Sequence, residues 1–426
     1  MKKMIIHGGK RLSGELTIGG AKNSTVALIP AAILADTPVR FDTVPHILDV
    51  HNLKIILESM NVHSTFENDV LTIDPTHIEE SELPSHAIKS LRASYYFMGA
   101  LLGRFNRATV TFPGGDNIGP RPIDQHIKGF KALGANVVEE NDSVFISTGT
   151  EGLHGARIFL DVVSVGATIN IILAAVKAHG TTTIENAAKE PEIIDLATFL
   201  NNMGAKIRGA GTDVIRIEGV DSLRSRATHT IIPDRIETGT YLSLAAAIGD
   251  GVLLKNVIPE HMESFTAKMI EMGVDLQINE DSIYVPRTND LGPVRIKTAT
   301  YPGFATDLQQ PITPLLLRAT GNSVVIDTIY PQRTQHIAQL RKMGADIRVQ
   351  DNLIVVGHSS HLQGAHVEAG EIRSGAALMI AGLAASGTTE ISRADNILRG
   401  YDRVIDKLHT LGADVEIATD EQVPEG

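Results

Sequence analysis

In the eight residues LNNMGAKI, 200–207, a helix-like stretch ends at Met203, a turn follows at Gly204, and a strand then begins. The same order of a closing hydrophobe, a Gly-Ala or similar turn and a strand recurs along the chain. The closing hydrophobes are Met60, Leu133, Met203, Met272, Met343 and Leu411, so successive copies lie 68–73 residues apart. Self-similarity at a nearly fixed spacing indicates a fold built from repeats.

Each repeat has the same predicted elements around this turn. An apolar stretch typical of a helix is followed by a short β-branched run typical of a strand. An amphipathic helix then leads to the Gly-Ala turn and, in most repeats, to a hairpin. The apolar helices occupy residues 23–36, 92–103, 165–180, 238–251, 306–321 and 373–387. They are apolar nearly all round, so we expect them to be buried.

Six repeats of about 70 residues predict an α/β fold of two domains with three repeats each. The leading segment, residues 1–20, reads as a strand pair without helices, and the last repeat stops soon after its Gly-Ala strand. We therefore expect the N-terminal strands to complete the C-terminal domain. The predicted domains are residues 22–229 and residues 1–21 plus 230–426, with two chain crossings between them.

The composition excludes several classes of protein. The chain has 426 residues without cysteine or tryptophan, which excludes disulfides, thiolate metal sites and thiol nucleophiles. A net charge of −12 and an aromatic content of 4% argue against nucleic acid as a partner. Its apolar runs fall short of the roughly 20 residues that span a bilayer, and its start is not typical of a signal peptide. We expect a soluble, cytoplasmic protein that does not bind membranes.

Three of the six apolar helices are expected to begin with a cation. Lys22 lies beside its expected cap, Asn23 or Ser24. Arg92 opens the second helix and Arg373 the sixth. The partial positive charge of a helix N-terminus makes a cation there unfavourable by roughly 0.3–1 kcal/mol. The other helices begin at Ser164, at Glu237 with Thr238, and at Asp307.

Each of these cations has an ordinary explanation, which is that its side chain turns toward solvent or a nearby acid. Three cations at the same position of three repeats instead favour a bound anion, which backbone amides and side chains hold together. Because the repeats differ mainly where these helices begin, we expect the site to be assembled there, between the two domains.

Two weaker patterns do not predict sites. His358, His361 and His366 fit no zinc spacing, and a surface loop is the better interpretation. The segment GAGTDV, 209–214, lies in a predicted hairpin and lacks the spacing of a dinucleotide fingerprint. We therefore expect neither a metal nor a cofactor.

Seven specific motifs follow one another along the chain. They are GGAKNS (19–24), PGGDNIGPRPID (113–124), VSVGAT (163–168), KEPEIID (189–195), PDRIETGT (233–240), TDLQQP (306–311) and ILRGYDRVIDKL (397–408). In this order they closely resemble the UDP-N-acetylglucosamine enolpyruvyl transferase family, over essentially the whole chain. The sister family, 5-enolpyruvylshikimate-3-phosphate synthase, shares the six repeats. Its first motif contains Lys-Ser, where this chain has Lys22 and Asn23.

The resemblance implies a fold and a reaction. The fold is a two-domain inside-out α/β barrel, with the helices of three repeats inside each domain. In the reaction, the 3-hydroxyl of the sugar attacks carbon 2 of phosphoenolpyruvate, carbon 3 takes a proton, and phosphate leaves from a tetrahedral intermediate. The product of this family feeds peptidoglycan synthesis. The expected partners are these two small molecules, and we expect a monomer or a weak oligomer.

The resemblance also implies roles for particular residues. The positions that grip phosphoenolpyruvate correspond to Lys22, Arg121 and Arg399, and other charged positions around the cleft to Arg92, Arg333, Glu371 and Arg373. The nucleotide-sugar site corresponds to Asn23, Arg121, Pro122, Ile123, Asp124, Gln125, Ser164, Val165, Gly166, Glu190, Asp307 and Ile329. Asp307 matches the group that takes the proton from the attacking hydroxyl. An ordinary helix N-cap is the alternative interpretation of Asp307, and the two roles are compatible.

The segment FPGGDNIGPRP, 112–122, matches the family's mobile lid loop, whose tip usually carries a cysteine as the general acid. The corresponding residue here is Asp116, and glycines at 114, 115 and 119 give the loop freedom to close. An aspartate has a reference pKa of about 3.9, and closure beside phosphate should raise it. We expect Asp116 to donate the proton, and we expect resistance to fosfomycin, an epoxide that alkylates the family's cysteine.

Two further positions depart from the family pattern. Val162 stands where a lysine or another polar residue is usual, and Glu371 stands where aspartate is usual. These departures leave a second hypothesis open, in which the chain is a weakly active or inactive paralogue that binds UDP-N-acetylglucosamine as a regulator. A 5-enolpyruvylshikimate-3-phosphate synthase is the third and least favoured hypothesis.

Overall fold

The computed structural model describes residues 2–81, 83, 95–111, 122–140 and 143–419. The predictions for Arg92, Asp116 and Arg121 therefore lie outside the described residues. The chain divides into two compact units, which we call the amino-terminal unit (described residues within 20–232) and the carboxy-terminal unit (residues 2–19 and 233–419).

The carboxy-terminal unit contains three four-stranded sheets. The first has the order β15 (Gln277–Ile278), β16 (Ser282–Val285), β14 (Gly249–Lys255) and β2 (Leu12–Thr17). The second has the order β17 (Arg295–Lys297), β18 (Ser323–Ile326), β20 (Leu353–Val356) and β19 (Ile347–Gln350). The third has the order β21 (His366–Glu368), β22 (Thr388–Ser392), β1 (Lys2–His7) and β23 (Asp414–Thr419).

The described part of the amino-terminal unit also contains three sheets. The first has the order β13 (His229–Thr230), β3 (Val39–Asp42), β5 (Val70–Asp74) and β4 (His63–Glu67). The second has the order β11 (Lys206–Arg208), β12 (Val214–Glu218), β10 (Thr181–Glu185) and β9 (Arg157–Phe159). The third has the order β6 (Arg107–Thr111), β8 (Ser143–Ser147) and β7 (Asn136–Glu140).

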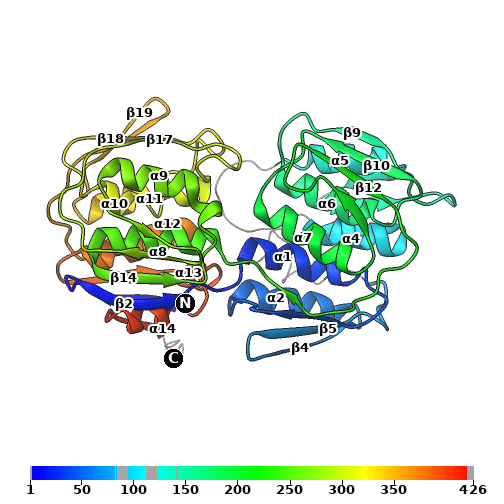
Figure 1. Ribbon diagram of the computed structural model, residues 1–426, viewed down its shortest axis with the longest axis horizontal. Helices are drawn as coiled ribbons and strands as arrows, with labels where there is room; N and C mark the ends of the chain where they lie inside the picture. The colour runs from blue at the N-terminus through cyan, green and yellow to red at the C-terminus, as the bar shows by residue number, and fades with distance from the viewer. Residues whose placement is uncertain (1, 82, 84–94, 112–121, 141–142, 420–426) are drawn as a thin grey trace, which may run out of the picture. The chain divides into compact units, whose positions relative to one another are not determined.

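One topology recurs in the five four-stranded sheets. An edge strand runs parallel to its neighbour, and the next two pairs are antiparallel, as in β9, β10, β12 and β11. Strands from the start of the chain complete two sheets of the carboxy-terminal unit. β1 pairs with β22 and β23. β2 pairs with β14, and Figure 1 shows the two side by side. The expectation of an N-terminal strand pair was wrong, because β1 and β2 enter different sheets. Within the described residues, each sheet is open rather than closed into a barrel.

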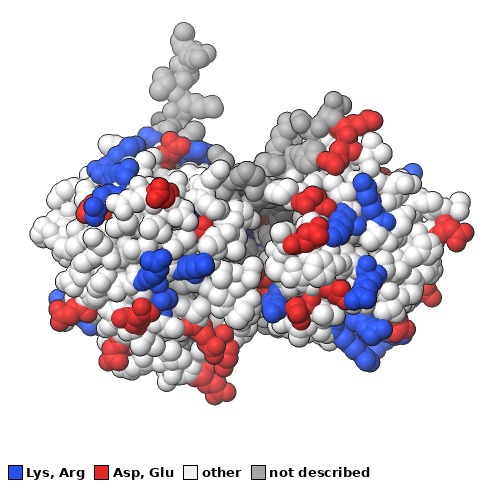
Figure 2. All heavy atoms as spheres, turned by 90° about the horizontal axis from the view of Figure 1, so that it is seen from above, with Lys and Arg blue, Asp and Glu red and all other residues white. Residues whose placement is uncertain are grey.

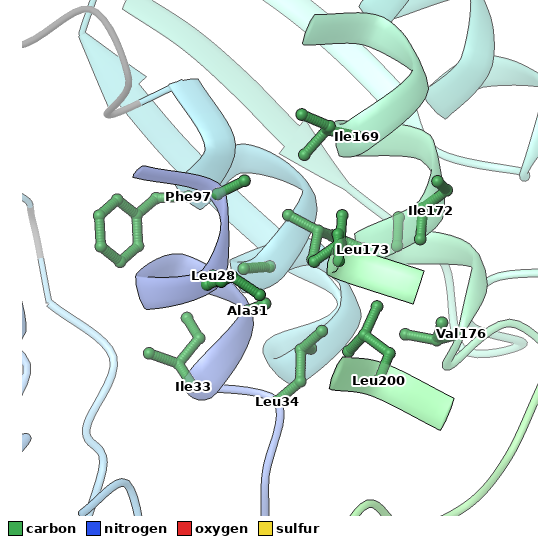
Figure 3. Close-up of a cluster of buried hydrophobic side chains, with 14 of the residues drawn as sticks. Leu28, Ala31, Ile33, Leu34, Phe97, Ile169, Ile172, Leu173, Val176 and Leu200 are labelled. Carbon is green, nitrogen blue, oxygen red and sulfur yellow. The ribbon is translucent and has the colours of Figure 1, made fainter. Parts of the chain in front are cut away.

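The first helix of each repeat supplies the core, as its composition predicts. In the amino-terminal unit, α4 (Tyr96–Phe105) packs against both α1 (Lys22–Ala32) and α6 (Val165–Ala175). In the carboxy-terminal unit, α8 (Arg235–Ile248) packs against α12 (Ile372–Ala384). Every residue of α8 from Ile236 onward is buried, so this helix is enclosed on all sides. Figure 3 shows buried side chains of such a core in the amino-terminal unit, among them Leu28, Leu34 and Leu173.

The second helix of each repeat is shorter or more amphipathic. These helices are α2 (Leu48–Ser59), α5 (Asp124–Ala132), α7 (Pro191–Asn202), α9 (Glu263–Met272), which follows the 3-10 turn η2 (Pro259–Met262), α11 (Gln335–Lys342), and the pair α13 (Asp395–Leu398) and α14 (Val404–Thr410).

The predicted helix at 306–321 is not continuous. It consists of a 3-10 turn η3 (Thr306–Leu308) and a short helix α10 (Thr313–Leu316). Pro311 lies between them and has no N–H to donate to the preceding turn, so a regular helix is interrupted there. As a result, Asp307 lies in an irregular segment rather than at the start of a long helix.

The turns that end the second helices share one geometry. The glycine after the closing hydrophobe is left-handed in five repeats, with φ of 95° at Gly134, 106° at Gly204 and 90° at Gly412, and Asn61 adopts φ 59° in the first repeat. The next N–H then bonds back across the helix end, as from Ala205 to the Leu200 carbonyl at 3.0 Å. This is the Schellman arrangement, which explains why glycine recurs at this position.

We predict that Gly204→Ala lowers the free energy of unfolding by about 1 kcal/mol, because a Cβ is unfavourable at this left-handed φ. Among the residues that the structure describes, no atom lies within 4 Å of a Cβ placed there, so the loss isolates the backbone effect. Gly149 is the matched control, since its Cβ would also meet open space and its φ is not left-handed. Gly149→Ala should leave the denaturant midpoint unchanged or raise it slightly. Equal losses in both variants would contradict the assignment.

The surface has no strong separation of charge on the face that Figure 2 shows, where acidic and basic side chains are interspersed on both units. Among the residues that the structure describes, no helix combines the length and the apolar character needed to cross a bilayer.

Candidate functional site

The first predicted cation lies at the start of α1, but the capping differs from the prediction. The helix begins at Lys22 itself, and its N-cap is Ala21 without a side-chain hydrogen bond, so neither Asn23 nor Ser24 is the cap. The Lys22 ammonium lies 3.6 Å from the carboxylate of Asp49, which is buried on α2. An adjacent anion therefore offsets the unfavourable helix dipole at this position.

The start of α6 is built as the sequence predicts. Ser164 is the N-cap, and its hydroxyl accepts a hydrogen bond from the Ala167 N–H at 3.1 Å. Val165 begins the helix and Gly166 follows it. A Cβ at Gly166 would lie 2.9 Å from Nε2 of His126, so glycine allows α5 to approach this helix end closely.

The residues Pro122, Ile123, Asp124 and Gln125 form the entry to α5, with Ile123 as the N-cap. The Gln125 side chain is locked in place: it accepts from the Asp161 N–H at 2.8 Å and donates to the Asp124 carboxylate at 2.9 Å. Glu190 is the buried N-cap residue of α7. In this unit, the predicted nucleotide-sugar residues thus gather at helix N-termini, where amides favour anions.

In the carboxy-terminal unit, Arg333 joins two predicted acids in one cluster. Its guanidinium donates to both carboxylate oxygens of Glu371, at 3.1 and 3.0 Å, and to Asp307 at 2.7 Å. Arg333 is 2% exposed and Glu371 is fully buried, whereas the Asp307 side chain is 26% exposed. Asp307 is therefore the member of this cluster that solvent or a ligand reaches.

Arg373 approaches the same acid from the start of α12. Its guanidinium lies 3.5 Å from Asp307 and stacks over the ring of Tyr401 at 5.2 Å. Burial by itself lowers the pKa of Arg333 and Arg373, but the surrounding acids, and for Arg373 also Tyr401, raise both pKa values above the ordinary range. Both arginines are therefore cationic, and two buried cations face one partly exposed carboxylate.

The role of Asp307 as a helix cap is not supported. The N-cap of η3 is Ala305, and it makes no side-chain capping bond. The acid instead points its two oxygens at Arg333 and Arg373. The helix-capping role belongs to Glu371, which accepts from the Arg373 N–H at 3.0 Å while it binds Arg333. One carboxylate thus serves both neighbours.

The two remaining predicted residues occupy turns of the same unit. Arg399 is the C-cap of α13, and its N–H donates to the Asp395 carbonyl at 2.9 Å. The N–H of Ile329 donates to the Asp327 carboxylate at 3.0 Å. That carboxylate also accepts from the Thr306 hydroxyl at 2.7 Å, which links the Ile329 turn to the segment of Asp307.

A second charged cluster lies at the start of α8. Glu237 is buried, accepts from the Gly19 N–H at 3.2 Å and forms an ion pair with Lys407. Lys407 also lies 3.1 Å from Asp402. Burial raises the pKa of Glu237 to about 7, and the attraction of Lys407 only partly offsets this effect.

We predict that this cluster makes stability pH-dependent. The folded pKa of Glu237 is raised from 4.5 to about 7, so its contribution is full below about pH 4.5 and is lost as pH rises through about 7. Relative to Glu237→Gln, which resembles the protonated form, the wild type should lose on the order of 2–3 kcal/mol of unfolding free energy between pH 5 and 8. Urea titrations at both pH values test this. A constant difference would mean that Lys407 keeps the acid ionised throughout.

The structure thus brings Asp307, Arg333, Glu371 and Arg373 into direct contact. Sequence reasoning missed the residues that support the predicted ones, which are Asp49 beside Lys22, and Asp327, Gln309, Gln310 and Tyr401 around the Asp307 cluster. The motifs TDLQQP and ILRGYDRVIDKL contain three of these five, so the signal lay in polar residues next to the predicted ones. Among the described ranges, no group of three or more metal-ligating side chains gathers at a distance suited to a metal ion.

The chain is similar to known proteins over its full length. Residues 6–408 match the family model described as EPSP synthase (3-phosphoshikimate 1-carboxyvinyltransferase). The chain is 95% identical over 425 residues to UDP-N-acetylglucosamine 1-carboxyvinyltransferase 2 of Lactiplantibacillus plantarum, with 100% of both chains covered. It is 56% identical over 420 residues to the Streptococcus pneumoniae protein of the same name, covering 99% of this chain and 100% of the relative.

Two solved structures are also similar. The enolpyruvyl transferase NikO from Streptomyces tendae matches with a TM-score of 0.88 and 25% identity over 99% of each chain. The EPSP synthase from Acinetobacter baumannii matches with a TM-score of 0.72 and 18% identity, over 98% of this chain and 100% of that one. The second similarity indicates a shared fold alone.

Proposed function

The chain belongs to the UDP-N-acetylglucosamine 1-carboxyvinyltransferases, within the EPSP synthase family, and we propose that it catalyses their reaction. It transfers the enolpyruvyl group of phosphoenolpyruvate to the 3-hydroxyl of UDP-N-acetylglucosamine and releases phosphate, a step of peptidoglycan synthesis. The observation that carries this proposal is 95% identity over the full length of a relative with that name.

Asp307 is the proposed base that accepts the proton of the attacking sugar hydroxyl. Three observations support this role: its carboxylate is partly exposed, two buried guanidiniums orient it, and it does not serve as a helix cap. A base needs a fixed position within hydrogen-bond reach of the proton it takes. The bonds to Arg333 and Arg373 supply that fixed position.

The cationic residues are the proposed ligands of the anionic substrates. Lys22 and Arg399, with Arg121, bind phosphoenolpyruvate, and Arg92, Arg333 and Arg373 add positive charge. The amides at the start of α6, capped by Ser164, suit the diphosphate of the nucleotide sugar. Asn23, Pro122 to Gln125, Glu190 and Ile329 complete the proposed nucleotide-sugar residues.

The remaining expectations are proposals about architecture and setting. We propose that each unit is a triplicate inside-out barrel, which the enclosed helices α6 and α8 and the recurring sheet topology support. We also propose that residues 112–122 act as the lid, and that the protein works in the cytoplasm, where phosphoenolpyruvate and nucleotide sugars are made, as a monomer or weak oligomer.

A phosphate-release assay with purified protein tests the function. Phosphate should appear only when phosphoenolpyruvate and UDP-N-acetylglucosamine are both present, and 3-phosphoshikimate should not replace the nucleotide sugar. Release with 3-phosphoshikimate would favour a 3-phosphoshikimate 1-carboxyvinyltransferase. Binding of UDP-N-acetylglucosamine by calorimetry without phosphate release would instead favour the regulatory paralogue.

A further inference from the structure

We infer that Gln309 is a positioning residue for the reaction, an inference that rests on the function proposed above. Its side-chain amide holds the main chain of Arg333, and the Arg333 guanidinium in turn holds the Asp307 carboxylate. Gln309 thereby acts on the proposed base through another residue rather than by contact with a substrate.

The contact between Gln309 and Arg333 is direct and buried. Nε2 of Gln309 donates to the Arg333 carbonyl at 2.8 Å, and the Gln309 residue is 1% exposed. Gln310 is fully buried, and its amide approaches the same carbonyl at 3.4 Å. A carbonyl oxygen only accepts, so the NH₂ end of Gln309 must face it, and this fixes the orientation of the amide.

These bonds close a ring around the Asp307 segment. Asp307 and Gln309 are two residues apart. The backbone N–H of Gln309 donates to the Thr306 carbonyl at 3.2 Å, which keeps this segment in a tight turn. Arg333 is held by the segment at both ends, its guanidinium by Asp307 and its carbonyl by Gln309. A displacement of the Arg333 main chain would therefore pull its guanidinium away from the proposed base.

An ordinary structural role explains these amides less well. In the part of the chain that the structure describes, the Oε1 atoms of Gln309 and Gln310 are buried without a hydrogen-bond partner. A buried polar atom without a partner is unfavourable, and an apolar side chain of similar size would avoid it. The N–H contact to Arg333 is the interaction that an apolar side chain would not provide.

The test compares Gln309→Met with Gln310→Met, two neighbouring buried amides replaced by the same apolar side chain. Phosphate release is measured against pH for both, together with KM for each substrate. Because small misplacements of a catalytic group are costly, kcat of Gln309→Met should fall about 10- to 100-fold, with KM values changed less than about threefold. Its acid limb should move to higher pH, because a carboxylate that loses an adjacent cation is protonated more readily. For Gln310→Met we expect less than about a threefold change in kcat, since its bond is longer.

Three outcomes would overturn the inference. One is a Gln309→Met enzyme that is less stable but keeps the wild-type kcat and acid limb, which is the pattern of a purely structural residue. Another is an equal loss of kcat in both variants. If Gln309→Met does not fold, Gln309→Asn replaces it in the test. Its amide sits on a side chain one methylene shorter and is therefore withdrawn from the Arg333 carbonyl. A wild-type acid limb in Gln309→Asn would also contradict the inference. Wild-type protein that releases no phosphate would instead overturn the proposed function itself, so the two failures are distinguishable.

Discussion

An Asp116→Asn enzyme is expected to turn over phosphoenolpyruvate and UDP-N-acetylglucosamine about 10²–10⁴ times more slowly than the wild type, because it loses the proposed general acid. Asparagine has nearly the same size as aspartate but holds no acidic proton for carbon 3. KM should change much less than kcat, since the cationic residues that bind the substrates are retained. Steady-state phosphate release measures both constants.

Asp116→Cys is the informative partner of this variant. A thiol also donates a proton, so the turnover of Asp116→Cys should persist. Fosfomycin should inactivate this variant, whereas the wild type should resist the drug. The alkaline limb of the pH profile should also move, because the reference pKa of cysteine is about 8.5 and that of aspartate about 3.9. Full turnover by Asp116→Asn, or indifference of Asp116→Cys to the drug, would exclude Asp116 as the donor.

The features that depend on local sequence were predictable. The closing hydrophobes mark the ends of the second helices, with Met203 and Leu411 as C-caps and Met272 as the last residue of α9. The apolar composition of 165–180 predicted a buried helix, and Ser164 is its N-cap. These features depend on residues within one turn of each other, where propensity and capping rules apply.

The features that depend on long-range packing were not predictable. The start of α1 illustrates this, because Asn23 and Ser24 are good capping residues and yet neither is the cap. The contacts among Asp307, Arg333 and Glu371 join residues from three parts of the chain. A repeat pattern places helix ends in register, but it does not specify how far each side chain reaches.

The interrupted helix at 306–321 lies between these two cases. Pro311 lies inside this stretch, and a proline inside a helix interrupts it, whereas the repeat pattern alone predicts a continuous helix. The interruption places Asp307 in a 3-10 turn, where its carboxylate meets Arg333 rather than the amides of its own helix. A departure from the repeat thus coincides with the proposed catalytic base.

Asp307→Asn is the second variant with a large expected effect. Its kcat should fall about 10²–10⁴-fold, because an amide does not take the proton of the sugar hydroxyl. The free energy of unfolding should fall by about 1.5–3 kcal/mol, because the charge that faces Arg333 and Arg373 is lost, although the Asn oxygen still accepts from Arg333 and this position is partly exposed. Phosphate release and denaturant unfolding on the same preparation separate the two effects.

Glu371→Gln is the matched control, because it removes a carboxylate from the same cluster at a fully buried position. Breaking a buried ion pair costs about 3–5 kcal/mol, so its main effect should be on the free energy of unfolding. The two variants should therefore rank in opposite orders in turnover and in stability. If Asp307→Asn instead loses stability as Glu371→Gln does and keeps its turnover, the Asp307 carboxylate serves to neutralise Arg333 and Arg373, and the base must be sought elsewhere.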